Sequence, residues 1–433
     1  MDLQPTIMTS QPDGLGLVGK ATARFHSYLK RHPRLRGRVI STFNAAGSLV
    51  DRIGPRDKSS LVGSVDPHRW VEHWNTDQSR PSARISNVLQ AEKTVNTPPL
   101  GIHGRIDPEY LEVASVDIPR PFVAEIPGGH VLGEHGAVAT PDGLIIDRAS
   151  RPVGSLNAHL SGYNANDLSA VALQSEWTRR PKRTAPAAVL SSWVGRGYFH
   201  WLFDILPRLK LLEESGNDLS SIPGFVVPSY FARYQIETLA RFGIERDRII
   251  SNFSHRHIVS ENLIVPSHPR ETGVIPRWVC DFLRDTFRPA RPAGVDPIPR
   301  IYIIRKQTDH GLLDNESGLT RRLVDMGFTP LAMEDYSLEE KAWLLKHAEV
   351  VVSASGAGLA NIVFCEPGTV VVELRVQPYP VMEAWDIGNR MNLRFYDVLP
   401  EDYERSQGMS AAADGMVSEE VVMSTLDEAG ISI

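Results

Sequence analysis

The sequence predicts an α/β protein built on parallel β-sheets. Three features indicate this: strand-like apolar runs alternate with helical segments, a proline-rich junction lies at residues 289–299, and a glycine-rich turn follows an apolar run near residue 355. Strands that alternate with helices need crossover connections, and such connections give parallel sheets. A chain of 433 residues favours two or three domains.

The composition is that of an ordinary globular protein, with 42% hydrophobic and 23% charged residues. This excludes a disordered chain, a collagen-like repeat and a disulfide scaffold. The formal net charge of -6 argues against nucleic acid as a partner. There are two cysteines, no signal-peptide pattern and no apolar run of ~20 residues, so we expect a soluble, cytoplasmic protein.

Residues 1–85 are predicted to form a basic N-terminal extension. No acid occurs between Asp13 and Asp51, whereas seven Lys and Arg residues gather between Lys20 and Arg38. This run could contact an anionic membrane surface or an anionic acceptor, or it could be a solvated helix and loop.

Residues 86–290 are predicted to form the first domain, which opens with a β-hairpin. Pro141, Asp142 and Gly143 lie between two apolar runs, a pattern typical of a hairpin turn. The chain then alternates between strands and helices. The expected segments are a strand at 187–194, a helix at 198–214, a strand at 224–229 and a helix at 230–243.

Residues 291–400 are predicted to form the second domain, after the exposed proline-rich junction. The expected segments are strand 300–305, a helix from 314 or 315 to 326, strand 328–333, helix 337–347, strand 349–354, turn 355–359, helix 360–364 and strand 369–374. Ser337 and Glu340 form a capping box. This order is typical of a doubly wound nucleotide-binding sheet. Residues 401–433 are expected to be a C-terminal tail.

The turn Ser355-Gly356-Ala357-Gly358 is the first candidate for a binding site. Glycines allow a close approach of the backbone, and the N–H groups that open a helix favour a phosphate. The spacing is neither GxGxxG nor a Walker A loop, so a tight turn without a ligand is an equal alternative. Glu373 ends the next strand and could accept hydrogen bonds from ribose hydroxyls, or could face solvent.

Arg305 and Lys306 follow directly after the strand at residues 300–305. Basic groups at the carboxyl end of a parallel strand face the crevice in which such sheets bind ligands. They would neutralise a diphosphate. The alternative is an ordinary charged strand end.

His200, Asp204 and Arg208 are spaced i, i+4, i+8 in an otherwise apolar helix. Such a helix should be buried, and burial of three ionisable groups is costly unless they pair or line a cleft. His200 and Asp204 form a possible general-base pair. A local ion-pair cluster on an exposed face is the alternative.

Several catalytic motifs are missing from the sequence. It has no D-x-D, H-E-x-x-H, C-x-x-C or G-x-S-x-G pattern. We therefore expect neither a metal nor a cofactor. Serine hydrolase, zinc protease, kinase and thiol-redox functions lose support.

With these motifs in view, the chain resembles glycosyltransferase family 61, whose bacterial members are often described as capsular polysaccharide biosynthesis proteins. The resemblance rests on GYFHWLFDILPRLKLL, on GAVATPDGLII before it, and on the stretch from residue 300 to residue 374. It covers about residues 111–374. Two positions differ from the family pattern: Ser355 replaces the usual His, and Lys341 replaces the usual Gln.

The resemblance implies a GT-B fold, in which two Rossmann-like domains enclose a cleft. It implies inverting, metal-independent transfer of a hexose or pentose from a nucleotide sugar to a glycan or lipid-linked polysaccharide acceptor. Because Ser355 replaces a possible donor to the diphosphate, a catalytically silent member that binds a nucleotide or polysaccharide is the alternative.

The same resemblance assigns roles to individual residues. Arg305 and Lys306 fall where the donor diphosphate would lie, and residues 355–358 supply the turn beside it. Glu373 is the ribose candidate. Asp204 is expected to be the base, with His200 as the alternative.

Overall fold

The computed structural model describes residues within a compact unit that spans residues 56–433. The described residues are 63–101, 109–112, 114–134, 136–150, 176–192, 195–271, 273–287, 291–305, 313–376, 382–400 and 416–432. Residues 1–62 are not among the described residues. The basic run between Lys20 and Arg38 therefore lies outside the described residues.

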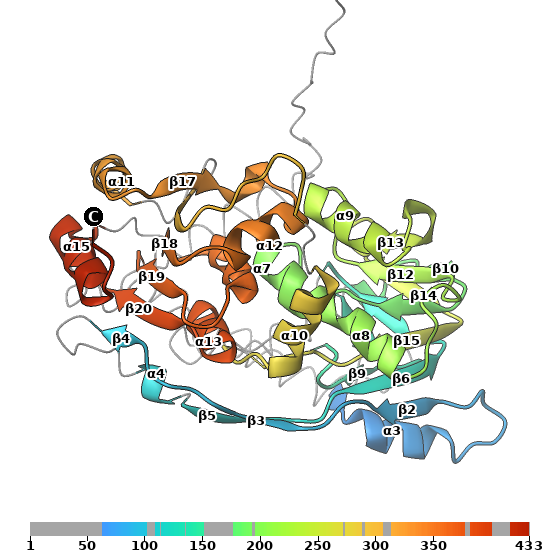
Figure 1. Cartoon of the computed structure of the whole chain (residues 1–433). Coiled ribbons are helices and arrows are strands. Elements are labelled where there is room, and N and C mark those ends of the chain that lie inside the picture. The colour runs from blue at the N-terminus through green and yellow to red at the C-terminus, as the bar shows by residue number, and fades with distance from the viewer. Residues whose placement is uncertain are drawn as a thin grey trace, which may run out of the picture. The chain divides into compact units, whose positions relative to one another are not determined.

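A parallel sheet of six strands forms the C-terminal half of the described chain (Figure 1). Its strand order is β17-β16-β18-β19-β20-β4. The bounds are β16 Arg300–Ile304, β17 Thr329–Ala332, β18 Val350–Ala354, β19 Val370–Leu374, β20 Arg394–Val398 and β4 Leu100–Gly101. β18 and β19 are valine-rich and buried throughout, as expected for strands covered on both faces.

The order of these strands locates the crevice of the sheet. β16 to β20 follow the order 2-1-3-4-5 along the chain, the arrangement of a doubly wound sheet. In such sheets the ligand lies outside the carboxyl ends of the strands where the winding reverses. Here that point lies between β16 and β18.

Helices connect these strands, and those at Glu316–Asp325 and Leu338–Lys346 confirm predicted helices, whereas those at Met333–Asp335, Met382–Met391 and Glu419–Glu428 were not predicted. They are α11 Glu316–Asp325, η4 Met333–Asp335, α12 Leu338–Lys346, η5 Ala357–Phe364, α13 Met382–Met391 and α15 Glu419–Glu428. The capping box of α12 is confirmed, because the Ser337 N–H donates to Glu340 Oε2 at 2.6 Å and the Glu340 N–H donates to Ser337 Oγ at 3.3 Å. The segment after the glycine turn, η5, is a 3₁₀ helix.

A second six-stranded sheet, of order β13-β12-β11-β15-β6-β2, forms the core of the N-terminal half. Its strands are β11 Ala187–Val189, β12 Gly224–Val227, β13 Ile249–Ser251, β15 Asn262–Pro266, β6 Phe122–Pro127 and β2 Arg84–Asn87. The first four are parallel in the order 3-2-1-4, and β6 pairs antiparallel with both β15 and β2. The helices are α7 Tyr198–His200, η2 Trp201–Ile205, α8 Pro207–Glu214, α9 Arg233–Arg241, η3 Arg246–Arg248 and α10 Arg277–Thr286.

A third sheet contains the predicted hairpin. Its order is β1 Gly63–Val65, β9 Leu144–Ile146, β8 Ala137–Ala139, β7 His130–Leu132, β14 His257–Ser260 and β10 Lys182–Thr184. β8 and β9 are antiparallel, and Gly143 has φ +83° in the turn that joins them. The hairpin prediction is confirmed. The remaining elements are α3 Pro67–Trp74, α4 Glu109–Glu112 and the antiparallel pair β3 Glu92–Val95 and β5 Ser115–Ile118.

One continuous hydrophobic core joins the two halves. It includes Leu209 of α8, Ile362 of η5 and Trp385 of α13. Figure 1 shows α7, α8, α10 and α13 between the sheet that contains β12 and the sheet that contains β18. The strands of the sheet that contains β12 all precede the predicted domain boundary at residues 290 and 291. The strands of the sheet that contains β18 follow it, except β4. The division into two domains at this boundary stays a prediction.

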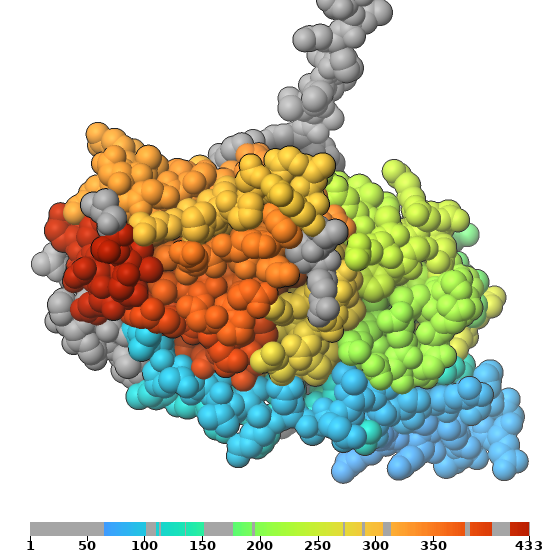
Figure 2. Space-filling model, in the orientation of Figure 1, coloured from blue at the N-terminus to red at the C-terminus, as the bar shows by residue number. Residues whose placement is uncertain are grey.

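The segment with β3 to β5 reaches from the N-terminal half to the C-terminal sheet (Figure 2). β4 pairs with β20. The Asn96 side-chain amide donates to Asp386 Oδ1 at 2.8 Å, and the Thr97 N–H donates to Asn389 Oδ1 at 2.7 Å. The chain therefore crosses between the halves at this edge as well as next to the described residues 291–299.

Folded elements also occur in the two terminal segments that the sequence assigned to an extension and a tail. Trp70 of α3 is buried and donates from Nε1 to Asp142 Oδ1 at 3.1 Å. Val422 and Leu426 of α15 belong to the same hydrophobic core as Tyr396 of β20. The folded unit thus extends past the boundaries at residues 85 and 400. No helix in the described ranges has the length and apolar character of a membrane span.

Candidate functional site

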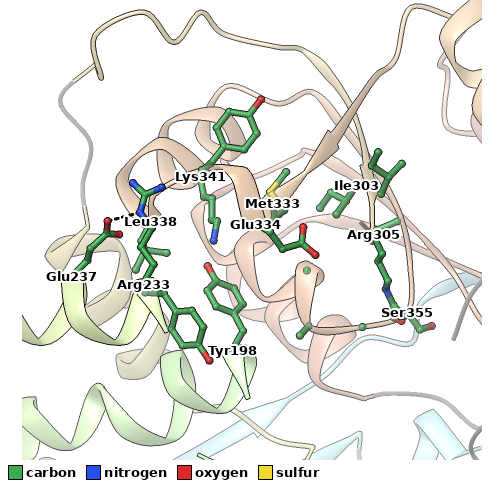
Figure 3. A pocket seen from close by; sticks show the side chains of 17 residues that line it. Tyr198, Arg233, Glu237, Ile303, Arg305, Met333, Glu334, Leu338, Lys341 and Ser355 are labelled. Atoms are coloured by element: carbon green, nitrogen blue, oxygen red, sulfur yellow. Dashed lines mark hydrogen bonds and ion pairs between the residues drawn. The ribbon is translucent and has the colours of Figure 1, made fainter. Parts of the chain in front are cut away.

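A pocket of about 550 Å³ lies at the switch point of the C-terminal sheet (Figure 3). Its walls come from the carboxyl ends of β16 and β18, from η4 and α12, and from α7 and α9 of the N-terminal half. Both halves of the described chain therefore contribute to one pocket, whose volume suits a small-molecule ligand.

The predicted glycine turn forms one wall of this pocket. Ser355, Gly356, Ala357 and Gly358 all line it, and Gly356 precedes the first residue of η5. A Cβ atom on Gly356 would overlap the guanidinium of Arg305. A Cβ on Gly358 would meet only Ile303 Cγ2, at 3.1 Å. The position of the Arg305 guanidinium against the turn therefore depends on the missing side chain of Gly356 more than on that of Gly358.

Arg305 lies beside this turn, as the sequence predicted. Its Nη2 donates to the carbonyl oxygen of Ser355, so a cation lies against the backbone that opens η5. Burial lowers the pKa of Arg305, whereas Glu316, Glu334 and Glu373 raise it. Lys306, the other predicted phosphate ligand, lies outside the described residues.

Lys341 reaches the pocket from α12 on the other side. Its Nζ lies 4.4 Å from the centre of the Tyr198 ring, and the residue is only 5% exposed. Burial lowers the pKa of Lys341 to about 8, while Glu334 and Glu237 oppose that shift. The pocket also holds an ion pair within α9, in which Arg233 Nε donates to Glu237 Oε1 at 2.6 Å.

Hydrogen bonds connect α7 to the glycine turn. The Tyr198 hydroxyl donates to Asn361 Oδ1 at 2.6 Å, and Asn361 Nδ2 donates to the Gly358 carbonyl at 2.9 Å. Burial raises the pKa of Tyr198 well above its ordinary value, so the phenol stays protonated. Tyr198 thus fixes a helix of the N-terminal half against the turn of the C-terminal half.

His200 and Asp204 pair as predicted, on a widened stretch of helix. Residues 201–205 form the π-helix η2, in which the Leu206 N–H donates to the Trp201 carbonyl at 3.0 Å. Pro207 follows, and it has no N–H to continue an ordinary helical turn. His200 Nδ1 lies 2.7 Å from Asp204 Oδ2. Such π-bulges are frequent at functional sites.

Arg270 is the main partner of Asp204, and sequence reasoning missed it. Its Nε donates to Asp204 Oδ1 at 2.6 Å, and both side chains are fully buried. Burial alone would raise the pKa of Asp204, but the charge of Arg270 and the hydrogen bond from His200 lower it well below its usual range. Asp204 is therefore a stable carboxylate and a weak proton acceptor.

Arg208 has a different role from the one that its spacing suggested. Its Nε donates to the Asp204 carbonyl oxygen at 3.1 Å, and its Nη2 lies 2.9 Å from His268 Nδ1. Arg208 is fully buried. It supports the backbone of η2, whereas the Asp204 carboxylate is paired with Arg270.

Glu373 does not line the pocket, although the sequence offered it as a ribose acceptor or a solvent-facing strand end. It is only 1% exposed, so the solvent-facing alternative is wrong. Its Oε1 has no hydrogen-bond partner among the described residues. Burial, reinforced by Asp397, raises the pKa of Glu373 to about 8.

The structure thus gathers Arg305 and residues 355–358 in one pocket, while His200, Asp204 and Glu373 lie outside its lining. It adds Glu334, which follows β17 by two residues. An acid after the second strand of a doubly wound sheet is a known ribose signal, and the sequence could have shown it. The described part of the chain contains no group of three His, Cys, Asp or Glu residues placed to hold a metal.

Fold and pocket together define an α/β protein with a polar site at the switch point of a doubly wound sheet. Residues 198–372 match the family model described as Glycosyltransferase 61. The match spans less than half of the chain, and it contains every predicted site residue except Glu373. It supports the family resemblance and a glycosyltransferase activity. Comparison with curated proteins finds no match.

Proposed function

We propose that the protein is an inverting glycosyltransferase of the GT-B type. It transfers a hexosyl or pentosyl group from a nucleotide sugar to a hydroxyl of a glycan or lipid-linked polysaccharide, and it needs no metal. The observation that carries this proposal is the contact between Arg305 and the turn that opens η5, inside the switch-point pocket. The family match supports the reaction class.

In this proposal the donor diphosphate lies against the turn at residues 355–358. A cation and the N–H groups at a helix N-terminus both favour a phosphate, and here Arg305 and η5 meet at one place. Glu334 lines the same pocket and replaces Glu373 as our candidate acceptor for ribose hydroxyls. Positive charge at the diphosphate stabilises it as it leaves.

His200 is the better candidate for the base. Asp204 is held as a carboxylate by Arg270, so His200 Nδ1–H donates to it and Nε2 keeps its lone pair. The His200 side chain is 29% exposed, whereas Asp204 is fully buried. His200 also lies on α7, the helix from which Tyr198 reaches the pocket.

The reaction then follows from these positions. Nε2 of His200 takes the proton of the acceptor hydroxyl, and the hydroxyl oxygen attacks the anomeric carbon from the face opposite the diphosphate. The bond from that carbon to the diphosphate oxygen breaks, and the diphosphate leaves with the electron pair. The new glycosidic bond has inverted configuration.

A panel of UDP-, GDP-, ADP- and CDP-sugars tests the proposal. Purified protein is first screened by thermal shift, and the release of nucleoside diphosphate from the stabilising donor is then measured. Wild-type protein should bind one donor and release its nucleoside diphosphate, His200→Gln should bind but release slowly, and Arg305→Ala should do neither. Failure of every donor to bind would show that the proposal is wrong.

The alternative is a catalytically silent nucleotide- or polysaccharide-binding protein, and one observation favours it. Ser355 offers only a small hydroxyl where the family usually has His, and that residue is 1% exposed. The same panel separates the two functions. Tight binding of a nucleotide sugar, with no release of nucleoside diphosphate to water or to glycan acceptors, would establish the silent protein.

A further inference from the structure

Lys341 is a buried cation that faces the pocket, and it forms no ion pair with a described residue. The residue is 5% exposed, and its ammonium donates to no carboxylate or carbonyl oxygen among the described residues. The centre of the Tyr198 ring lies 4.4 Å from Nζ. Burial of a charge is costly unless the charge is paired. A buried ammonium that lines a cavity therefore indicates an anionic ligand.

The acids around Lys341 do not form an ion pair with its ammonium among the described residues. Two of them accept hydrogen bonds from other residues, and together they only partly oppose the effect of burial. Glu340, on the same helix, accepts from the Ser337 N–H in the capping box. Glu237 of α9 accepts from Arg233. Glu334 of η4 is the third acid near Lys341, and it favours the ammonium form, whereas the charge of Arg233 disfavours that form. The net effect is that burial lowers the pKa of Lys341 to about 8.

A short series of contacts connects Lys341 to the glycine turn. Its ammonium packs on Tyr198, Tyr198 bonds Asn361, and Asn361 bonds the Gly358 carbonyl. Arg305 contacts the same turn at the Ser355 carbonyl. In Figure 3, Lys341 and Arg305 point into the pocket from opposite sides of Glu334. Two cations from different elements thus line one pocket, and Tyr198 and Asn361 connect Lys341 to the turn that Arg305 contacts directly.

We propose that Lys341 is the second cation of a diphosphate site, and that it binds, together with Arg305, the diphosphate of a nucleoside diphosphate ligand. This inference rests on the proposed function, because it assigns the phosphate-binding groups of the same pocket. It also gives the pocket a cation that compensates for Ser355, whose hydroxyl carries no charge. The leaving diphosphate would be neutralised by two side chains without a metal.

The proposal predicts a specific pH dependence. Lys341 binds the diphosphate only as the ammonium form, and in the free protein that form is lost as the pH rises through about 8. The terminal phosphate of a nucleoside diphosphate titrates near pH 6, so its charge is constant above that range. Affinity should therefore fall by up to tenfold per pH unit above pH 8.

The experiment measures the Kd of UDP, GDP, ADP, CDP and pyrophosphate by calorimetry at pH 7.0 and pH 9.5. For the tightest ligand, Lys341→Met should weaken binding at least ~10-fold at pH 7.0, which is about 1.4 kcal/mol. Lys341→Arg should bind at both pH values, whereas wild-type protein should lose affinity at pH 9.5. Lys346→Met removes the same charge from the last turn of α12, outside the pocket lining, and should change nothing.

Each contrary result identifies what is wrong. Equal binding by wild-type protein and Lys341→Met, or a wild-type affinity that is the same at both pH values, would overturn the role of Lys341 and leave the proposed function standing. Normal binding with lost transfer in Lys341→Met would make Lys341 a catalytic group instead, and would also overturn this inference. If wild-type protein binds none of the five ligands, the proposed function itself fails.

Discussion

Arg270 donates from Nε to Oδ1 of Asp204 at 2.6 Å, and neither side chain is exposed. The two residues are far apart in sequence, and the contact determines which group can act as a base. A carboxylate held by a buried guanidinium keeps its charge, because protonation would leave the cation unpaired. Asp204 can still orient His200, whose Nδ1 it contacts at 2.7 Å. The pair therefore resembles an orienting acid and a base.

We expect His200→Gln to lose ~100- to 10,000-fold in transfer rate, the range of general-base catalysis, with nucleotide-sugar affinity and thermal stability close to wild type. The imidazole is partly exposed and contacts Asp204 through Nδ1, so the fold should tolerate glutamine at this position. Steady-state rates, calorimetric binding and thermal unfolding provide the measurements. A His200→Gln enzyme with near-normal turnover would exclude His200 as the base.

Asp204→Asn should differ from His200→Gln in stability. Neutralising Asp204 leaves Arg270 buried beside a group without charge, and breaking a buried pair typically costs about 3–5 kcal/mol. We expect reduced transfer together with a clear fall in the free energy of unfolding, measured by urea denaturation. Arg270→Met with Asp204→Asn removes both charges and should recover part of the loss. A fully stable but inactive Asp204→Asn protein would support Asp204 as the base after all.

Arg305 should be essential, whereas divalent metal should not. Arg305 donates to the Ser355 carbonyl in the glycine turn, and it would there stabilise the charge of the leaving diphosphate. Arg305→Ala should therefore lower the transfer rate by roughly 100-fold or more. Excess EDTA should leave the wild-type rate within about twofold. Rates measured before and after chelation, with magnesium or manganese added back, test this. Recovery of a lost rate on adding either metal would contradict it.

The sequence predicted individual strands, helix caps and turns, but it did not predict the tertiary contacts between them. Runs such as VVVSA and VVVEL are buried strands whose identity follows from local composition, and the Ser337 capping box needs only neighbouring residues. The hairpin at Gly143 is likewise local. These features depend on the residues beside them, so a linear reading finds them.

The site required information that a linear reading does not contain. Arg270 contacts Asp204 only through tertiary packing, and the residues that flank Arg270 in the sequence do not indicate this contact. Lys341 departs from the family pattern in the sequence, but only tertiary packing places the Tyr198 ring beneath its ammonium. Glu373 was expected at an accessible strand end, but the packing around β19 buries it.

The glycine turn allows a comparison of two substitutions. A Cβ on Gly356 would overlap the Arg305 guanidinium, whereas a Cβ on Gly358 meets one flexible methyl group of Ile303 at 3.1 Å. We therefore expect Gly356→Ala to weaken nucleotide binding at least ~10-fold, about 1.4 kcal/mol, and Gly358→Ala to weaken it much less. Calorimetry on both folded variants measures this. Equal effects would show that the position of Arg305 against the turn does not control binding.

Glu373 provides the last prediction, which concerns stability rather than catalysis. Burial raises the pKa of Glu373 to about 8 in the folded protein, compared with about 4.5 for an ordinary glutamate. A carboxyl whose pKa is higher in the folded than in the unfolded chain contributes most to the free energy of unfolding below pH 4.5. That contribution is lost as the pH rises toward 8. Glu373→Gln cannot ionise, so its stability relative to wild type should increase by at least ~1 kcal/mol between pH 5 and pH 8. Urea denaturation at several pH values measures the difference, with the exposed Glu349→Gln as the matched control. Parallel pH profiles for wild type and Glu373→Gln would mean that Glu373 is ionised in the fold and has found a partner for its charge.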